Sequence, residues 1–519
     1  MAQAHRSGGP VRTARRRRVC GHARALLAML VTALVAGGAV PYVSGPGRAY
    51  VSYLVLAERE DAAGATRAGK ESRAAGGQVV QEYPQIGAVL TYATGGFAER
   101  VRSRPGIAAV GATRTAPVVG PPRKLAGAGD FAAGVGRGWR GDAGDGGTGK
   151  AAGTVPDPRE GGAWNLAMVH AGAGAGAGTA SGAASGAVAG VGPTGDGVGG
   201  VPGPEAMRKV LVAVLDSGVD DTHPDLRAAV DPKASASCAD GRPDARTGSW
   251  RPDPGVEESG HGTHVAGIIG AARDGQGVTG VAPGVRIAAV RLLGPLGQYY
   301  AENIVCGMLW AADHGAKAIN DSYFADPWKY NCPEDPDQAA LIAAVGRAVA
   351  YARRKGAVVV ASAGNDGQDL GAARTDQRSP NDRVTGPAPT RYLGTECIRL
   401  PGELPGVVTV TAVNRDGSPS SYTNYGRGRI SLAAPGGDPD GGAEGAIVSD
   451  WPGGQYAALA GTSMSAAHVT GAVAVAAALH PDFGAAQLAD LLARTAAGCP
   501  VRGCGDRGHF GAGLLVVPR

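Results

Sequence analysis

The chain has 519 residues, of which 44% are hydrophobic and 18% are charged. This length exceeds that of one compact domain, so we expect two or three units, and the composition excludes a generally disordered chain. Residues 1–24 hold seven arginines and no acidic residue, so without them the formal charge falls by 7, from +5 to −2. The remaining chain has no basic excess that would indicate nucleic-acid binding.

The arginine-rich start is followed by an apolar run, Ala25–Val40. A basic segment before a short apolar one is typical of a secretory signal peptide, and the run is short for a membrane span. We therefore interpret residues 1–49 as a signal region, with Gly47–Ala49 as a candidate end. The expectation is a secreted protein without a mature membrane span. A retained signal anchor is the alternative, and the export route stays open.

Residues 50–118 have the pattern of a small separate α+β unit. Strand, helix, strand, strand, helix and strand are expected in turn at Tyr50–Ala57, Asp61–Ala75, Gln78–Tyr83, Ile86–Tyr92, Phe97–Ser103 and near Val110. This order is the split ferredoxin-like pattern.

From residue 119 to 204 the chain becomes rich in Gly, Ala and Pro. The tract Ala171–Gly178 and the Ser/Ala/Gly stretch after it offer too little side-chain surface to offset the entropy of ordering. We expect an exposed linker here. Its one compact apolar segment, Ala163–His170, is either the first helix of the next domain or an incidental apolar patch.

Residues 205–519 alternate apolar strands with helices. Val210–Leu215 is apolar throughout, as expected of a strand buried on both faces of a parallel sheet. Further strands are expected at Ala316–Ser322, Ala357–Ser362 and Val407–Ala412, and helices at Asn303–His314 and Gln338–Lys355. The repeated units predict a doubly wound α/β domain, a mostly parallel sheet with helices on both faces and function at the strands' carboxyl ends.

The cysteine content fits an exported protein. Of seven cysteines, Cys20 lies in the signal region and six remain, an even number that indicates disulfides but allows 15 pairings. The short separation favours Cys499–Cys504. We then expect Cys332–Cys397 and Cys238–Cys306, although the sequence leaves the connectivity open.

Three distant segments carry the residue types of a serine-protease triad. Asp216 follows the strand Val210–Leu215, His261 lies between glycines at a helix start, and Ser463 follows Gly-Thr before an Ala/Val-rich helix. Alone, each fits a simpler role as a turn carboxylate, a packing imidazole or a helix cap. Together, in the order Asp, His, Ser, they predict Ser463 as nucleophile, His261 as base and Asp216 as the group that orients the imidazole.

A fourth segment, Val358–Asn365, ends a predicted buried strand with Gly-Asn. The Asn365 amide is expected to donate to an oxyanion beside the Ser463 backbone N–H. With this segment, the motifs resemble the signature blocks of the subtilase family, the subtilisin-like serine endopeptidases, over about residues 205–515. Further similar stretches are Asp220–Leu226, Gly277–Pro283, Ile319–Ser322 and Leu432–Gly436.

The resemblance implies a subtilisin-like fold and hydrolysis of polypeptide substrates through an acyl-enzyme, with no cofactor for catalysis. Residues 50–118 resemble the inhibitory propeptide of such enzymes, which implies an autoprocessed precursor with its own propeptide as partner; we expect a monomer. The segments expected to flank the substrate are Ser322, Tyr323, Phe324, Ser362, Ala363 and Gly364.

The resemblance also implies a structural calcium site. Asp225 and Asp274 resemble its side-chain ligands, with backbone carbonyls near Ala272, Gln276 and Val278 completing a shell of oxygen donors, the type that calcium prefers. The alternative is an Asp274-Gly275 turn without a metal.

Three features depart from the family pattern. Ala467 stands where the family usually has Pro, with little expected effect. Tyr323-Phe324 replaces the more usual Leu-Gly and is expected to change the wall of the specificity pocket. The polar insertion Asp366–Glu403 is either surface decoration or a rim that shapes substrate choice.

Two other classes of function remain as alternatives. His261-x-x-His264 could pair on a metal, but zinc-protease helices place two His four residues apart with a Glu between, and His264 is more simply a helix residue packed behind the site. A binding protein on a degenerate protease scaffold would lack a triad member, and none is absent.

Overall fold

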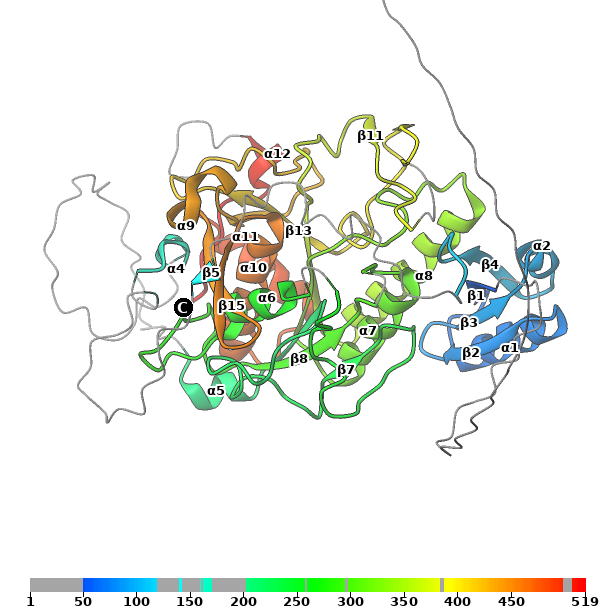
Figure 1. Ribbon diagram of the computed structural model, residues 1–519, viewed down its shortest axis with the longest axis horizontal. Coiled ribbons are helices and arrows are strands. Elements are labelled where there is room, and N and C mark those ends of the chain that lie inside the picture. The colour runs from blue at the N-terminus through cyan, green and yellow to red at the C-terminus, as the bar shows by residue number, and fades with distance from the viewer. Residues whose placement is uncertain are drawn as a thin grey trace, which may run out of the picture. The chain divides into compact units, whose positions relative to one another are not determined.

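The computed structural model describes residues 50–118, 140–141, 159, 162–169, 202–256, 259–294, 297–382, 387–497 and 506–519 (Figure 1). The predicted signal region 1–49 and the predicted pair Cys499–Cys504 lie outside these residues.

Residues 50–118 contain the predicted succession of strands and helices. Its elements are β1 (Val51–Ala57), α1 (Ala62–Ala74), β2 (Gln78–Tyr83), β3 (Ala88–Ala93), α2 (Phe97–Arg102) and β4 (Ile107–Ala112). The strands form an antiparallel sheet in the order β2-β3-β1-β4. Asp61 caps α1 by accepting a hydrogen bond from the Gly64 N–H, as short acidic residues do at helix starts.

A seven-stranded parallel sheet forms the centre of residues 202–519. In spatial order its strands are β14 (Leu432–Pro435), β13 (Val408–Val413), β10 (Val358–Ser362), β9 (Ala318–Asp321), β6 (Leu211–Asp216), β8 (Arg286–Arg291) and β7 (Ala236–Ser237). The predicted parallel α/β sheet is therefore confirmed, and β7, β8 and β14 are strands that the sequence analysis did not include.

Helices cover both faces of this sheet. Alternate residues of a strand point to opposite faces, so Val212 and Val214 of β6 join one core while Leu211 and Leu215 join another. The first core is shared with α6 (His261–Gly270), α10 (Thr462–Leu479) and α11 (Ala485–Thr495). The second core is shared with α7 (Ala301–Asp313) and α8 (Pro336–Arg354).

The helix ends follow local chemistry. Asp335 caps α8 by accepting from the N–H groups of Asp337 and Gln338, Pro336 occupies the first turn, and Gly356 with φ of 95° follows the end. By contrast, α10 has no side-chain cap and is buried along nearly its whole length. Among the described residues, α10 is also the one helix long and apolar enough to cross a membrane, but 89% of that window is buried in the protein.

Smaller elements complete the described chain. They are β5 (Arg140–Gly141), α4 (Trp164–Met168), α5 (Pro204–Arg208), β11 (Arg374–Asp376), β12 (Arg391–Leu393), the 3-10 helix η2 (Pro439–Gly441), α9 (Gly442–Gly445), β15 (Ile447–Trp451), β16 (Gln455–Leu459) and α12 (Arg507–Phe510). Strands β15 and β16 form an antiparallel hairpin beside α6.

Helix α4 lies within the segment expected to be a linker. Leu166 and Val169 belong to the same core as α6 and α10, and the Asn165 amide lies 2.8 Å from His468 Nε2 on α10. Of the two interpretations of the apolar segment Ala163–His170, the structure therefore favours a helix of the following domain.

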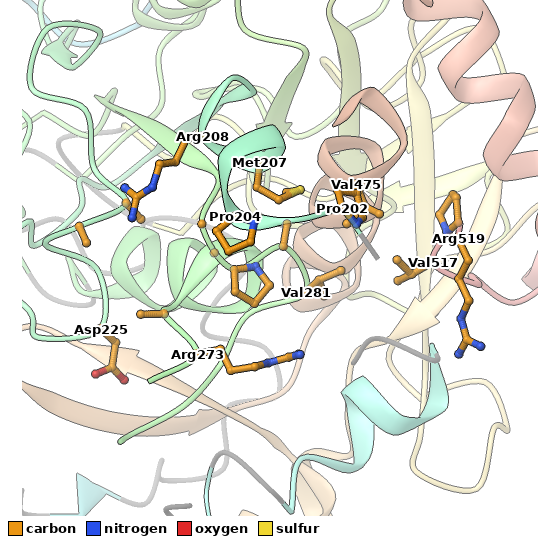
Figure 2. A pocket seen from close by; sticks show the side chains of 18 residues that line it. Pro202, Pro204, Met207, Arg208, Asp225, Arg273, Val281, Val475, Val517 and Arg519 are labelled. Atoms are coloured by element: carbon orange, nitrogen blue, oxygen red, sulfur yellow. The ribbon is translucent and has the colours of Figure 1, made fainter. Parts of the chain in front are cut away.

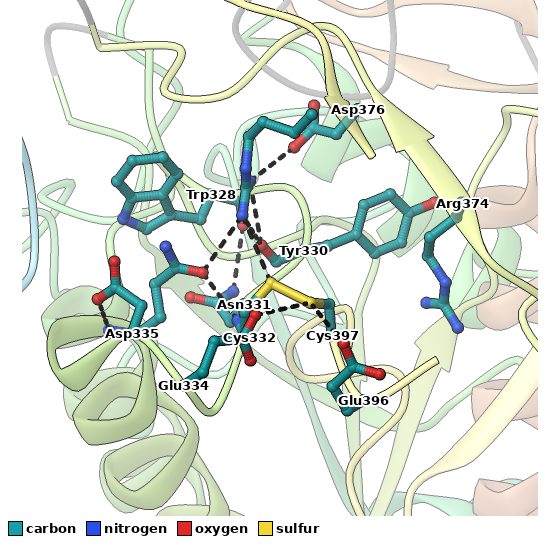
Figure 3. The surroundings of a disulfide bond; sticks show 12 residues. Trp328, Tyr330, Asn331, Cys332, Glu334, Asp335, Arg374, Asp376, Glu396 and Cys397 are labelled. Carbon is teal, nitrogen blue, oxygen red and sulfur yellow. Dashed lines mark hydrogen bonds and ion pairs between the residues drawn. A yellow bond between two sulfur atoms is a disulfide. The ribbon is translucent and has the colours of Figure 1, made fainter. Parts of the chain in front are cut away.

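Two disulfides are formed among the described residues. Cys238–Cys306 and Cys332–Cys397 are bonded as expected. Figure 3 shows the second bond beside Glu334 and Glu396, where it joins the polar insertion to the chain before α8. The insertion Asp366–Glu403 is further held by the buried ion pair between Arg374 and Glu403, whose closest atoms lie 2.6 Å apart.

Candidate active site

Asp216 and His261 form the best-defined contact of the site. His261 Nδ1 lies 2.9 Å and 3.0 Å from the two carboxylate oxygens of Asp216, and the two residues His261 and Asp216 are 3% and 0% exposed. The Ser217 N–H also donates to Asp216 Oδ1, at 2.6 Å. Because a carboxylate only accepts, Nδ1 must carry a proton, and Nε2 is the nitrogen that would take a proton from a nucleophile.

Glycine is needed where α6 begins against β6. A Cβ added at Gly262 would lie 2.4 Å from the Gly218 carbonyl oxygen and 3.0 Å from Asp216 Cβ. These separations are shorter than atoms tolerate, so only glycine lets the first turn of α6 approach the end of β6 this closely. The Gly-His-Gly sequence thus brings His261 within hydrogen-bond distance of Asp216.

Ser463 lies in the first turn of α10, where backbone N–H groups have no partner within the helix. Its hydroxyl donates to the Ser322 carbonyl oxygen at 3.3 Å, and the Ser322 hydroxyl donates to the Ser463 carbonyl oxygen at 3.2 Å. Helix α6, which begins at His261, and helix α10, which begins at Thr462, pack against each other (Figure 1).

Asn365 lies beside the residues that precede Ser463. Its Oδ1 accepts from the Thr462 N–H at 3.0 Å and from the Thr462 hydroxyl at 2.7 Å. The Gly364 N–H in turn donates to the Thr462 hydroxyl oxygen, at 3.1 Å. Because Oδ1 is occupied, the Asn365 amide presents its N–H donors on the opposite side, as an oxyanion donor requires.

The predicted substrate-binding residues lie at the ends of β9 and β10. Ser362 and Ala363 are buried, and Gly364 has φ of 100° with Asn424 Nδ2 only 2.5 Å from where its Cβ would be. Tyr323 and Phe324 are 1% and 2% exposed. The Tyr323 ring turns to the interior, so its effect on the pocket wall stays a prediction.

A buried network behind Asp216 was not anticipated. Tyr299 stacks on Tyr323, with ring centroids 4.8 Å apart, and its hydroxyl lies 3.4 Å from Asp216 Oδ1. The Tyr323 hydroxyl donates to Asp321. Burial, opposed by this hydrogen bond and reinforced by the Asp216 charge, raises the pKa of Asp321 to about 7. Asp321 belongs to the motif Ile319–Ser322 noted in the sequence. Nothing in the sequence around Tyr299 indicates this contact, because Tyr299 comes from a distant loop.

His264 is a packing residue in the structure. It is fully buried on α6, and its Nε2 lies 3.1 Å and 3.0 Å from the carbonyl oxygens of Ile447 and Ala457. Burial lowers its pKa to about 3. Among the described residues, the clusters with metal-ligand spacing include neither His261 nor His264.

The two aspartates expected to bind calcium, Asp225 and Asp274, differ in how far they are exposed to solvent. Asp225 is buried, and its Oδ2 accepts from the Val278 N–H at 3.0 Å, which holds the carboxylate against the loop of the other expected donors. Asp274 is exposed, and its Oδ1 accepts from the Gln276 N–H at 3.1 Å. The oxygen donors suit calcium, and ligation of calcium by these residues stays a prediction.

A hollow of about 510 Å³ lies beside Asp225. Pro204, Met207, Arg273 and Val517 line it together with Asp225 (Figure 2). No predicted catalytic residue lines it, so this hollow is not the place where Ser463 would meet a substrate.

A parallel α/β sheet with a buried Asp–His pair and a serine at a helix start defines the class of serine hydrolases. The model of the subtilase family matches residues 207–513. The chain belongs to this family of subtilisin-like serine proteases, and its fold is the subtilase fold.

Curated relatives agree with this placement. The chain is 30% identical over 306 residues to M-protease of Shouchella clausii and 32% identical over 308 residues to subtilisin NAT of Bacillus subtilis subsp. natto. Each match covers 59% of this chain, and 62% and 64% of the two relatives. The chain therefore spans less than two thirds of the length of these two proteins.

A solved protein structure also has a fold similar to that of this chain. The epidermin leader peptide processing serine protease from Staphylococcus aureus superposes with a TM-score of 0.61 at 19% identity, covering 90% of this chain and 97% of that one. At this identity the likeness concerns the fold alone.

Proposed function

We propose that this chain is a secreted serine endopeptidase that hydrolyses peptide bonds with Asp216, His261 and Ser463. The observation that carries the proposal is the pair of contacts, at 2.9 Å and 3.0 Å, between His261 Nδ1 and the Asp216 carboxylate. A buried imidazole held in this tautomer is the arrangement that a general base for a serine nucleophile requires.

The proposed reaction has two steps, acylation of Ser463 and hydrolysis of the acyl-enzyme. Ser463 Oγ attacks the scissile carbonyl carbon while His261 Nε2 takes its proton, and the Ser463 N–H and Asn365 amide donate to the oxyanion. The imidazolium, stabilised by Asp216, gives its proton to the leaving amine, and the acyl-enzyme remains. Water then attacks with His261 as base again, which releases the acid and restores Ser463.

We further propose that residues 50–118 are an inhibitory propeptide of an autoprocessed precursor. Supporting contacts are the buried ion pair between Arg114 and Glu302 of α7 and the hydrogen bond from the Tyr83 hydroxyl to the Gly241 carbonyl, at 2.6 Å. Leu54 and Leu90 also share a core with Leu215. Such contacts stabilise a bound inhibitor through buried apolar area and paired charge.

The test is N-terminal sequencing of the exported protein beside its Ser463→Ala form. We expect that the parent protein has lost its N-terminal segment, whereas the Ser463→Ala variant remains an uncleaved precursor. Normal maturation of Ser463→Ala would show that another protease does the processing. Tyr83→Phe and Glu302→Gln are expected to speed the appearance of activity because they remove contacts to residues 50–118.

Labelling with a serine-directed phosphonate separates an enzyme from a degenerate scaffold. The mature parent protein should be labelled at Ser463, and the loss of its activity should be proportional to the fraction of protein that is labelled. Absence of label on the folded mature protein would favour a binding protein. Loss of activity with chelator that zinc alone restores would instead favour a metallopeptidase.

A further inference from the structure

The segment that follows β4 is held by a carboxylate of the insertion Asp366–Glu403. Asp382 Oδ2 accepts from the Thr115 N–H at 2.8 Å and from the Ala116 N–H at 3.1 Å, and its Oδ1 accepts from the Thr115 hydroxyl. Asp382 is 0% exposed. The insertion therefore contacts both the backbone and a side chain of this segment.

A second carboxylate holds Arg114, the residue before Thr115. The guanidinium forms an ion pair with Glu302 in the first turn of α7 and lies 3.9 Å from the centroid of the Tyr300 ring. The side chains of Arg114 and Glu302 are 11% and 0% exposed. An ion pair combined with a contact to an aromatic face is an arrangement that favours arginine over lysine.

Both carboxylates receive their hydrogen-bond donors from residues 50–118. Within the described part of the chain, Asp382 accepts only from residues 115 and 116, and the Glu302 carboxylate only from Ser52 and Arg114. A buried carboxylate that loses its donors is costly. Once residues 50–118 have left, the two carboxylates are therefore able to bind another ligand with matching donors.

Tyr300 connects the two carboxylates with the proposed catalytic residues. Burial and nearby carboxylate charges, those of Asp382 and Glu302 among them, raise the pKa of the Tyr300 hydroxyl, so both groups act on the same ring. The preceding residue, Tyr299, has its hydroxyl 3.4 Å from Asp216 Oδ1. The acidic surface thus adjoins the proposed active site.

We propose that Glu302, Tyr300 and Asp382 form a subsite for polypeptide substrates that carry arginine followed by threonine or serine on the N-terminal side of the scissile bond. This inference rests on the proposed function. Cleavage that releases residues 50–118 falls after Val118, so the residues that fill the subsite precede the bond that is cut. The docked segment would then occupy the subsite as the first substrate of the enzyme.

The donors of such a ligand match the acceptors of the subsite. A guanidinium offers two parallel N–H groups to the Glu302 carboxylate and a planar face to Tyr300, which the compact charge of a lysine does not reproduce. The next residue donates to Asp382 through its hydroxyl, and threonine and serine are the residues that carry a hydroxyl this close to the backbone. Through Asp382, the insertion would take part in substrate choice.

The test is competition by synthetic peptides with the matured, exported parent enzyme. A peptide with the sequence of residues 110–118 carries the Arg-Thr pair and should competitively inhibit the hydrolysis of labelled casein. Glutamine in place of its arginine should raise the inhibition constant at least about tenfold, because a charge-assisted hydrogen bond is lost. Valine in place of its threonine should raise the constant about threefold or more, because one hydroxyl hydrogen bond is lost.

Variants of the enzyme should remove each preference separately. Glu302→Gln should bring the inhibition constants of the arginine and glutamine peptides within about threefold of each other, and it should keep the preference for threonine over valine. Asp382→Ala should have the reverse effect. The matched control, Asp369→Ala, removes the same charge from the same insertion at a residue that accepts from the Gly371 N–H, and it should keep both preferences.

The outcomes separate this inference from the proposed function. A parent preparation that folds but hydrolyses nothing would refute the proposed function and the subsite with it. An active enzyme that the arginine and glutamine peptides inhibit equally, or not at all, would refute the subsite alone. Because the peptide replacements alter no residue of the enzyme, this comparison remains decisive when a variant does not fold.

Discussion

Asn365 Oδ1 accepts two hydrogen bonds from Thr462, the residue before the proposed nucleophile. The Thr462 N–H donates at 3.0 Å and the Thr462 hydroxyl at 2.7 Å. The first turn of α10 therefore positions the amide of Asn365, so both proposed oxyanion donors are held by the same helix start. A donor held in advance is worth more in catalysis than one that must reorient during the reaction.

Replacing Asn365 by Ala should lower kcat by about 10²–10³ with little change in KM, because the lost hydrogen bond is made to the oxyanion rather than to the bound substrate. Steady-state hydrolysis of a peptide amide measures this. Asn414→Ala, which alters a turn after β13, is the control. A loss confined to KM would contradict the assigned role.

Asp216→Asn should lower kcat by about 10⁴. The amide of the variant would donate to His261 Nδ1, which reverses the tautomer and leaves Nε2 protonated and unable to act as base. Asp221→Asn, which removes only the partner of exposed Arg251, should leave kcat unchanged. Equal effects of the two variants would refute the orientation of His261 by Asp216.

Asp321 should make the protein less stable as the pH rises from about 4 to about 7. In the unfolded chain a carboxyl loses its proton near pH 4, whereas burial raises the pKa of folded Asp321 to about 7. The folded state then binds the additional proton in this window, so the free energy of unfolding falls by at most roughly 1.4 kcal/mol per pH unit.

Urea unfolding of the Ser463→Ala chain at pH 4, 5.5 and 7 measures this slope, and Asp321→Asn should flatten it. Asp416→Asn serves as a control that should leave this slope nearly unchanged, because hydrogen bonds from Ser418 lower the pKa of Asp416 and move its titration below this pH window. Identical slopes for the parent and Asp321→Asn would exclude a proton on Asp321 in the folded state.

Removing the Cys332–Cys397 disulfide by Ser at both positions should cost up to about 4 kcal/mol of stability, from the entropy of a loop closed over 65 residues. The bond ties the insertion Asp366–Glu403 to the chain before α8, so this region should become more protease-sensitive. Denaturant unfolding and limited proteolysis measure the two effects. Unchanged values for both would show that other contacts of the insertion, such as the Lys329–Asp366 ion pair, hold it without the disulfide.

Local patterns predicted the parts of the molecule that depend on neighbours in sequence. Apolar runs such as Val210–Leu215 must be buried on both faces, which leads to the parallel sheet, and Gly on both sides of His261 indicates a close approach of backbone. The same patterns led to Asp216, Ser463 and Asn365, because each stands at a strand end or a helix start.

Tertiary structure decided the relationships between residues far apart in the chain. The stacking of Tyr299 on Tyr323, and the meeting of His223 with Asp450, depend on which strands and loops become neighbours. No local periodicity encodes these contacts, since each joins separate elements. The sequence by itself determined the family, its fold and the residue types of its site, whereas burial in the folded protein decided which carboxyl groups, such as Asp321 and Asp450, have a raised pKa.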